Sequence, residues 1–221
     1  MRHDVRLSSA ISALRRVLLG RRTPPVRDAA ALTELLDAHT SYVAQRTVIE
    51  YCRARAGFNW DKLFAEPSFV EHYEVCRWEG YAAALAEVAE LALIRLRDAG
   101  AAAPEGYLPG LVQVARAALL RHPVPRHRAS WTDAADAIEP HLARALLAAP
   151  RPVHMVGLHA AEVMFGLLPI HADLRRQDRE MFENSVRFAI CGAFEEMTRR
   201  LDVAALEASL LAAADAAAGP S

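Results

Sequence analysis

The chain has 221 residues, of which 53% are hydrophobic and 24% charged, and its net charge is −1 at pH 7. This length and composition suffice to bury the core of one domain, and no long stretch is typical of a disordered protein. The near-zero charge argues against nucleic-acid binding by the chain as a whole, and no run of about 18 apolar residues offers a membrane span.

The charges are unevenly distributed. Residues 1–27 contain seven arginines and one aspartate, a net charge of +6, which leaves about −7 for the rest of the chain. Lys62 is the only lysine among the 26 basic residues, and alanine is abundant. We interpret this bias as the codon usage of a GC-rich, bacterial genome. The choice of arginine over lysine is therefore weak evidence for a bidentate binding site.

The three cysteines, Cys52, Cys76 and Cys191, are widely separated and form no CxxC pair. An odd number at this spacing favours reduced, mostly buried thiols over a disulfide framework or a zinc site. The N-terminus shows no signal-peptide pattern, because Arg15 and Arg16 interrupt any apolar run. The sequence therefore predicts a cytoplasmic protein.

Residues 1–22 are predicted to form a basic amphipathic helix, which Thr23-Pro24-Pro25 would end. Its apolar stripe has four residues, none of them aromatic: Leu7, Ile11, Leu14 and Leu18. We favour docking of this helix on the acidic remainder of the chain or on a protein partner. Contact with a membrane surface is the less favoured alternative, since so small a stripe binds weakly.

Residues 28–218 are predicted to form one all-helical globular domain. The first helix of this domain would begin at an Asp28 cap and stop at Gly57, and a loop with one short helical turn would follow. A capping box of Ser68 and Glu71 would open a long helix that ends near Asp98. The later segments, separated by prolines and glycines, are a loop at 100–110 and helices at 111–121, 130–149 (broken or kinked at Pro140), 153–168, 173–201 and 203–217.

Strand signals are absent, since the chain has neither alternating β-branched runs nor Asn-Gly turns. The fold class that follows is an all-α, single-domain bundle of seven or eight helices.

Nine of the fifteen aromatic residues lie in one window, Tyr42–Tyr81. At 100° per residue, Tyr42, Arg46 and Glu50 share a narrow polar sector of their helix with His39 and Arg53. We consider a ligand pocket or partner surface here, with Arg46 as an anion clamp and with Trp60 and Trp78 closing the pocket. The alternative is a solvated helix face beside aromatic residues that fill the core.

Two pairs of polar residues are weaker candidates. His159 and Glu162 are three apart on an otherwise apolar helix, so they share a face and could form a general base or half a metal site. Glu71 and Glu74 could be an inward-facing carboxylate pair, although a capping role suits Glu71 better. No Glu-x-x-His, His-Glu-x-x-His or cysteine–histidine cluster is present, so we expect no metal site.

Motifs for nucleophilic catalysis, phosphate loops and dinucleotide binding are also missing, and we predict no cofactor. A regulator with a helix-turn-helix is disfavoured, because residues 1–57 do not divide into short helices around a tight turn. We expect a cytoplasmic regulatory or adaptor protein that acts through protein contacts, as a homo-oligomer (a homodimer in the simplest case) or with another protein. The alternative is a small-molecule-binding or enzymatic bundle with its pocket in the Tyr42–Tyr81 window, and whether the chain is an enzyme stays open.

Overall fold

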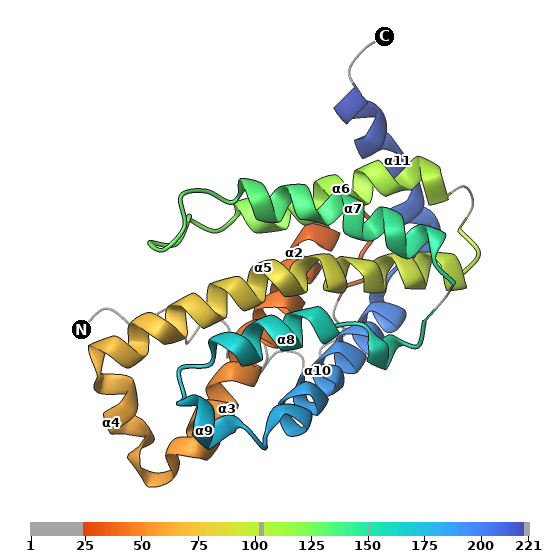
Figure 1. Cartoon of the computed structure of the whole chain (residues 1–221). Coiled ribbons are helices and arrows are strands. Elements are labelled where there is room, and N and C mark those ends of the chain that lie inside the picture. Colours follow the sequence, from red (N-terminus) through yellow and green to blue (C-terminus); the bar gives the residue numbers. More distant parts are fainter. Residues whose placement is uncertain (1–23, 102–103, 150, 219–221) are drawn as a thin grey trace.

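The computed structural model describes residues 24–101, 104–149 and 151–218, and these ranges form a helical bundle (Figure 1). The α-helices of ten residues or more in these ranges are α2 (Ala29–Ser41), α3 (Thr47–Ala56), α5 (Pro67–Asp98), α6 (Pro104–Leu120), α7 (Thr132–Leu147), α8 (Leu158–Leu167), α10 (Arg179–Arg200) and α11 (Val203–Ala218). The shorter helical segments are η1 (Tyr42–Arg46), η2 (Gly57–Asn59), α4 (Trp60–Ala65), η3 (Val153–Met155) and α9 (Ala172–Arg175).

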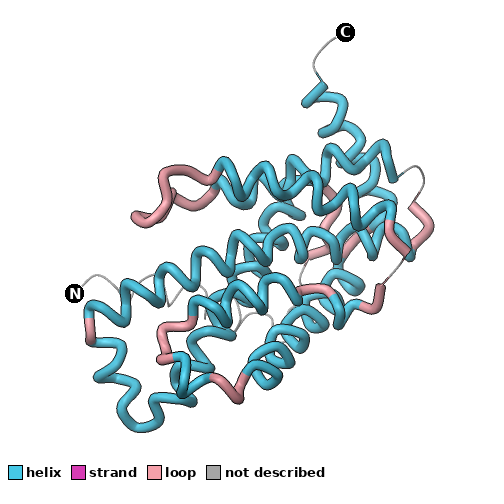
Figure 2. The backbone as a smooth tube through the Cα atoms, in the orientation of Figure 1, coloured by secondary structure: helices cyan, strands magenta, loops and turns pink. Residues whose placement is uncertain are grey.

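The predicted all-α bundle of seven or eight helices is confirmed, because the described ranges contain eight long helices and no strand (Figure 2). None of the described helices is both long and apolar enough to cross a membrane. The basic helix predicted at residues 1–22 lies outside the described residues.

Helix α5 passes through the middle of the bundle, with α6 and α7 on one side and α8 and α10 on the other (Figure 1). Every residue from Ala84 to Leu93 is buried. An ordinary surface helix buries one stripe only, so α5 is covered on all sides over this stretch. Two of these ten buried residues are glutamates, Glu87 and Glu90.

Helices α2 and α3 form one continuous rod joined by the π-helical segment η1. The residues on its inner edge recur every four positions and are fully buried: Leu32, Leu36, Thr40, Ala44, Val48 and Cys52. A regular α-helix would drift by about 40° at each four-residue step, whereas a π-turn holds more residues and reduces this drift. The π-segment therefore helps to keep one edge of a long helix on the core.

Several predicted boundaries are confirmed. The Asp28 carboxylate accepts a hydrogen bond from the backbone N–H of Ala31 (2.8 Å), and Gly57 ends α3 with φ of 54°. Helix α11 follows directly after Asp202 as predicted, whereas α7 continues through Pro140, so a break there is wrong.

Other boundaries were predicted wrongly. The long helix α5 begins at Pro67 after an extended Glu66, so no Ser68–Glu71 capping box forms. Residues 104–110 belong to α6 rather than to a loop. The helix predicted at 153–168 is broken at Gly157, whose φ of 87° no α-helix allows.

Candidate functional site: a polar cavity between α5, α7 and α8

A cavity of about 670 Å³ opens between α5, α7 and the start of α8. Ligand pockets in proteins have volumes of about 300–1,000 Å³, so this space suits a small molecule. It is lined by both charged and apolar residues: Glu87, Glu90, Ile94, Arg97, Asp98, His141, Arg144, Ala145, Ala148, Ala149, Arg151, Leu158, His159 and Glu162.

Glu87 lies on the floor of the cavity and caps a neighbouring helix. Gly157 starts α8 with its first N–H groups facing α5, and the two Glu87 oxygens accept hydrogen bonds from the backbone N–H groups of His159 (3.2 Å) and Ala160 (3.0 Å). Burial raises the pKa of Glu87 above its ordinary value, and these two hydrogen bonds offset only part of that effect. The carboxyl group satisfies helix donors that would otherwise be unpaired.

Glu90, one turn further along α5, joins α5 to two other segments. Arg151 donates from Nε (2.8 Å) and from its terminal nitrogen (2.5 Å), and His141 Nε2 on α7 lies 2.8 Å from the same carboxylate. Burial raises the pKa of Glu90, but the hydrogen bonds from His141 and Arg151 outweigh it and hold the pKa below its ordinary value. Glu90 is therefore an ionised buried carboxylate with three donors.

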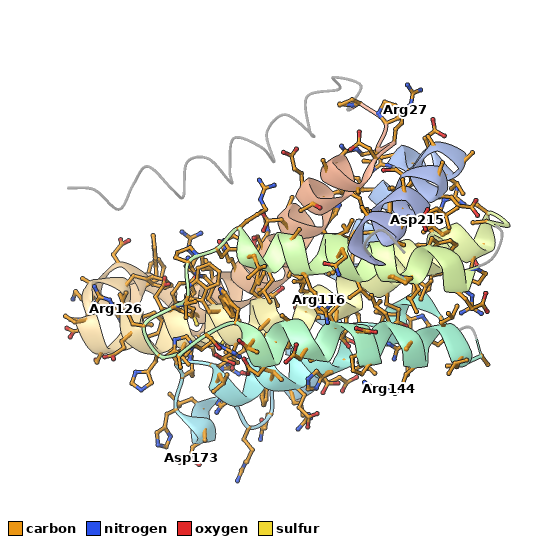
Figure 3. The ribbon with its side chains drawn as sticks, turned by 90° about the horizontal axis from the view of Figure 1, so that it is seen from above. Arg27, Arg116, Arg126, Arg144, Asp173 and Asp215 are labelled. Carbon is orange, nitrogen blue, oxygen red and sulfur yellow. The ribbon has the colours of Figure 1, made fainter. Side chains whose placement is uncertain are left out.

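Two arginines at the rim are in a different situation. Arg97 donates only to the carbonyl oxygen of Ala145 (3.2 Å). Arg144 is exposed near the C-terminal end of α7, far from the loop before α7 that carries Arg126 (Figure 3). Within the described part of the chain, neither guanidinium forms an ion pair with a carboxylate. The cavity therefore has buried acceptors that are occupied and guanidinium donors that remain available.

Two carboxylates also reach the rim. Asp98 is exposed at the end of α5, and Glu162 pairs with Arg179 at 3.5 Å. Because Arg151 pairs with Glu90, the charged groups that remain at the cavity mouth are the guanidinium groups of Arg97 and Arg144 and the carboxylates of Asp98 and Glu162.

The sequence placed His159 and Glu162 together, and both do line this cavity. Both side chains are exposed, however, and Glu162 bonds Arg179 rather than His159. Sequence reasoning missed the two buried glutamates and the arginines around them. The sequence signal that could have located the two glutamates is the apolar run Ala84–Leu93, which contains them one helical turn apart.

The structure brings Tyr42, Arg46 and Glu50 together on the outside of the α2–α3 rod. Arg46 pairs with Glu50 at 2.7 Å and its guanidinium lies 5.4 Å from the centre of the Tyr42 ring, but both charged side chains are about half exposed. His39, predicted on the same stripe, is turned inward and lies 3.5 Å from Glu196. The intervening π-segment breaks the uniform angular step on which the stripe was based.

The structure does not bring Trp60 and Trp78 together around one pocket. Trp60 packs edge-on against Phe64 and under Arg53, whereas Trp78 packs against Tyr81, His122 and Trp131. Neither tryptophan lines the cavity described above, and Tyr42, Arg46 and Glu50 do not line it either.

The Trp78 side chain belongs to a cluster that fastens the loop between α6 and α7. Asp37 of α2 accepts a hydrogen bond from the Tyr81 hydroxyl (2.9 Å) and lies 2.7 Å from His122 Nε2. Trp131 donates from its indole nitrogen to the His122 carbonyl (3.1 Å). These bonds engage the polar side chains of Asp37, Tyr81, His122 and Trp131, so the cluster provides structural support for the loop.

Glu71 and Glu74 do not face inward. Glu71 is exposed, and Glu74 pairs with Arg77 on the same helix at 2.9 Å. The inward carboxylate pair that the sequence suggested near Ser68 exists further along α5, at Glu87 and Glu90.

A second, smaller cavity of about 290 Å³ lies near the end of α3. Its lining is mainly apolar: Arg55, Ala56, Asn59, Leu63, Ile170 and Leu174. Arg55 is paired with Asp178, which also accepts from the Tyr51 hydroxyl (2.7 Å). The one charged group of this cavity is thus already neutralised.

All three cysteines are free thiols, two of them buried, as predicted. Burial raises the pKa of Cys52 to about 12 and that of Cys76 still higher, so neither is a thiolate nucleophile near neutral pH. The described ranges contain no group of three or more His, Cys, Asp or Glu side chains arranged to hold a metal ion.

No family model, curated protein or solved structure matches the chain.

Proposed function

We propose that this protein binds a small anionic molecule, carrying a carboxylate or phosphate group, in the cavity between α5, α7 and α8. The observation that carries the proposal is the contrast between occupied acceptors and available donors: Glu87 and Glu90 are fully engaged, while Arg97 and Arg144 have no carboxylate partner in the described ranges. A guanidinium fork matches the geometry of both carboxylate and phosphate oxygens.

The remaining lining suits a ligand with a short apolar part. Ile94, Leu158 and three alanines of the α7 end provide apolar walls beside the charged rim. Pockets that bind small molecules commonly combine such walls with a few polar groups that fix orientation. The Arg151–Glu90–His141 contacts hold these walls together, since they connect α5, α7 and the segment that leads into α8.

A thermal-shift screen tests the proposal. The probes are inorganic phosphate, citrate, succinate and a nucleoside monophosphate, with uncharged and cationic compounds of similar size for comparison. A ligand at ten times its Kd stabilises the folded state by about 1.4 kcal/mol, or about 3–6 °C in Tm for a chain of this size. We expect such a shift with at least one anion.

The matched variants are the double substitution Arg97→Ala with Arg144→Ala, which should abolish the shift, and Arg126→Ala, which should preserve it. Arg126 is an exposed arginine on the loop at the far end of α7, so Arg126→Ala removes one guanidinium without touching the cavity (Figure 3). Equal shifts in both variants, or shifts with cations only, would contradict an anion site.

Action through protein contacts is the second candidate function. It is favoured by apolar side chains that stand exposed on α10, Phe188 at 81% and Met181 at 51%. Such a role is compatible with ligand binding, because α10 contributes no residue to the lining of the α5–α7–α8 cavity. We also propose a bacterial, cytoplasmic origin, supported by the arginine bias and the unpaired thiols.

A further inference from the structure

Helix α10 lies along one edge of the bundle, with its inner face on α5 and α8 (Figure 1). Its inner residues Phe182, Val186 and Ile190 are buried. Its outer face carries a line of exposed residues at alternating steps of four and three: Met181, Ser185, Phe188, Gly192, Glu195 and Arg199. We call this line the α10 stripe.

Phe188 and Gly192 are adjacent on the stripe and opposite in shape. Phe188 is 81% exposed, and a Cβ atom built on Gly192 would have no neighbour within 4 Å. Glycine in the middle of an exposed helix costs about 1 kcal/mol relative to alanine. Nothing within the described part of the protomer requires a glycine at this position. The stripe therefore presents a large apolar knob beside a notch.

We propose that the α10 stripe binds a second copy of this chain, with the two α10 helices antiparallel about a twofold axis. An axis at the level of Ile190 places Phe188 opposite Gly192 of the other copy, because the two residues are equally far from position 190. The same axis brings Met181 to Arg199 and Ser185 to Glu195. Each Phe188 then fills the notch of the other copy, and the aliphatic stem of Arg199 covers Met181.

Charge complementarity supports the antiparallel direction. Glu180 near the start of α10 and Arg199 near its end are both exposed, and neither forms an ion pair within the described ranges. In the antiparallel pair Glu180 of one copy lies within one position of Arg199 of the other. A parallel pair would instead place the two Glu180 residues together and the two Arg199 residues together.

A single helix pair buries little surface compared with a standard interface, so we expect a dimer Kd of about 1–100 µM. Sedimentation velocity on the full chain, over a concentration range that brackets this Kd, is the primary measurement. Phe188→Ser should weaken the dimer by about thirtyfold, as expected for a central aromatic residue. Phe58→Ser, which removes an even more exposed phenylalanine outside α10, should have no effect.

The variant Gly192→Leu distinguishes an effect on the dimer interface from an effect on the stability of the fold. The new side chain meets open space in the protomer and improves helix propensity, so Tm should stay equal or rise, while the filled notch should abolish the dimer. Glu180→Arg and Arg199→Glu should each weaken the dimer by about twofold to fivefold, and the double reversal should restore it.

A wild-type chain that stays monomeric over the whole range would overturn the proposal and leave the stripe to another partner. A Gly192→Leu variant that dimerises as strongly as the wild type would overturn the contact, and a double charge reversal weaker than both single variants would overturn the antiparallel direction. Since no residue of the stripe lines the α5–α7–α8 cavity, these results are independent of the anion screen.

Discussion

Glu87 and Glu90 lie one helical turn apart on α5, both buried, yet their surroundings shift the pKa of the first upward and that of the second downward. The difference comes from the donors. Two backbone N–H groups face Glu87, whereas a guanidinium and an imidazole face Glu90. Only the latter pair contributes enough positive charge to overcome the desolvation of a carboxylate.

Glu87→Gln should change the slope of stability against pH. Because the folded pKa of Glu87 is raised, its contribution to stability is present below the unfolded pKa of about 4.5 and is lost as pH rises through the folded pKa. The difference in unfolding free energy, wild type minus variant, should therefore fall as pH rises from about 4.5. Urea unfolding at a series of pH values measures this, and a difference that is constant or grows with pH would refute the raised pKa.

Glu90→Gln should show the opposite slope. The folded pKa of Glu90 is lowered, so its contribution is present above about 4.5 and is lost as pH falls through the folded pKa. At pH 7 we expect a loss of about 2–3 kcal/mol, since the charge-assisted hydrogen bonds of Arg151 and His141 lose their acceptor charge. The same unfolding series provides the measurement. A loss that is as large in strong acid as at neutral pH would contradict the ion-pair account.

Gly110→Ala should destabilise the protein by about 2–3 kcal/mol. A Cβ atom at Gly110 would lie 2.1 Å from the carbonyl oxygen of Leu210, so α6 and α11 would have to separate. The control is Gly166→Ala in α8, where the added atom meets nothing within 4 Å and stability should stay equal or rise by up to about 1 kcal/mol. Equal effects of the two substitutions in chemical denaturation would exclude the close approach.

Arg46→Ala and Glu50→Ala, singly or together, should change stability by no more than about 0.5 kcal/mol, because an exposed pair four residues apart contributes little. The anion-induced thermal shift should also persist in the double variant, since these residues do not line the α5–α7–α8 cavity. Loss of that shift would instead indicate that the anion binds in the Tyr42–Tyr81 window.

The helical class followed from the sequence because hydrophobic periodicity and turn residues are local signals. Asp28 and Gly57 mark the ends of the α2–α3 rod through their own backbone preferences. Pro109 and Gly110 led to the wrong prediction of a loop at 100–110 for the same reason. They are local helix breakers, but Pro109 lies in the second turn of α6, and Gly110 is needed where α11 approaches. Only tertiary packing reveals the second role.

The cavity was harder to predict because its residues come from three separate segments. Helix α5 supplies Glu87 and Glu90, α7 supplies His141 and Arg144, and Arg151 lies in the connection to α8. The spacing of the two glutamates is visible in the sequence, whereas the distance from Glu90 to Arg151 is set by the fold. The abundance of arginine made the cavity still harder to predict, because a single arginine among 25 carries little information about a binding site.

The pairing of Val26 with the end of α10 has a consequence for the order in which the chain can fold. Val26 donates to the carbonyl of Arg200 (2.8 Å) and accepts from the N–H of Asp202 (3.0 Å), and the N–H of Ala29 at the start of α2 donates to Ser209 on α11 (3.0 Å). During synthesis, the start of α2 leaves the ribosome long before α11 exists. The hydrogen-bonding groups of Val26 and Ala29 therefore have no partners until α11 has left the ribosome. Closure of this part of the bundle therefore cannot precede the synthesis of α11.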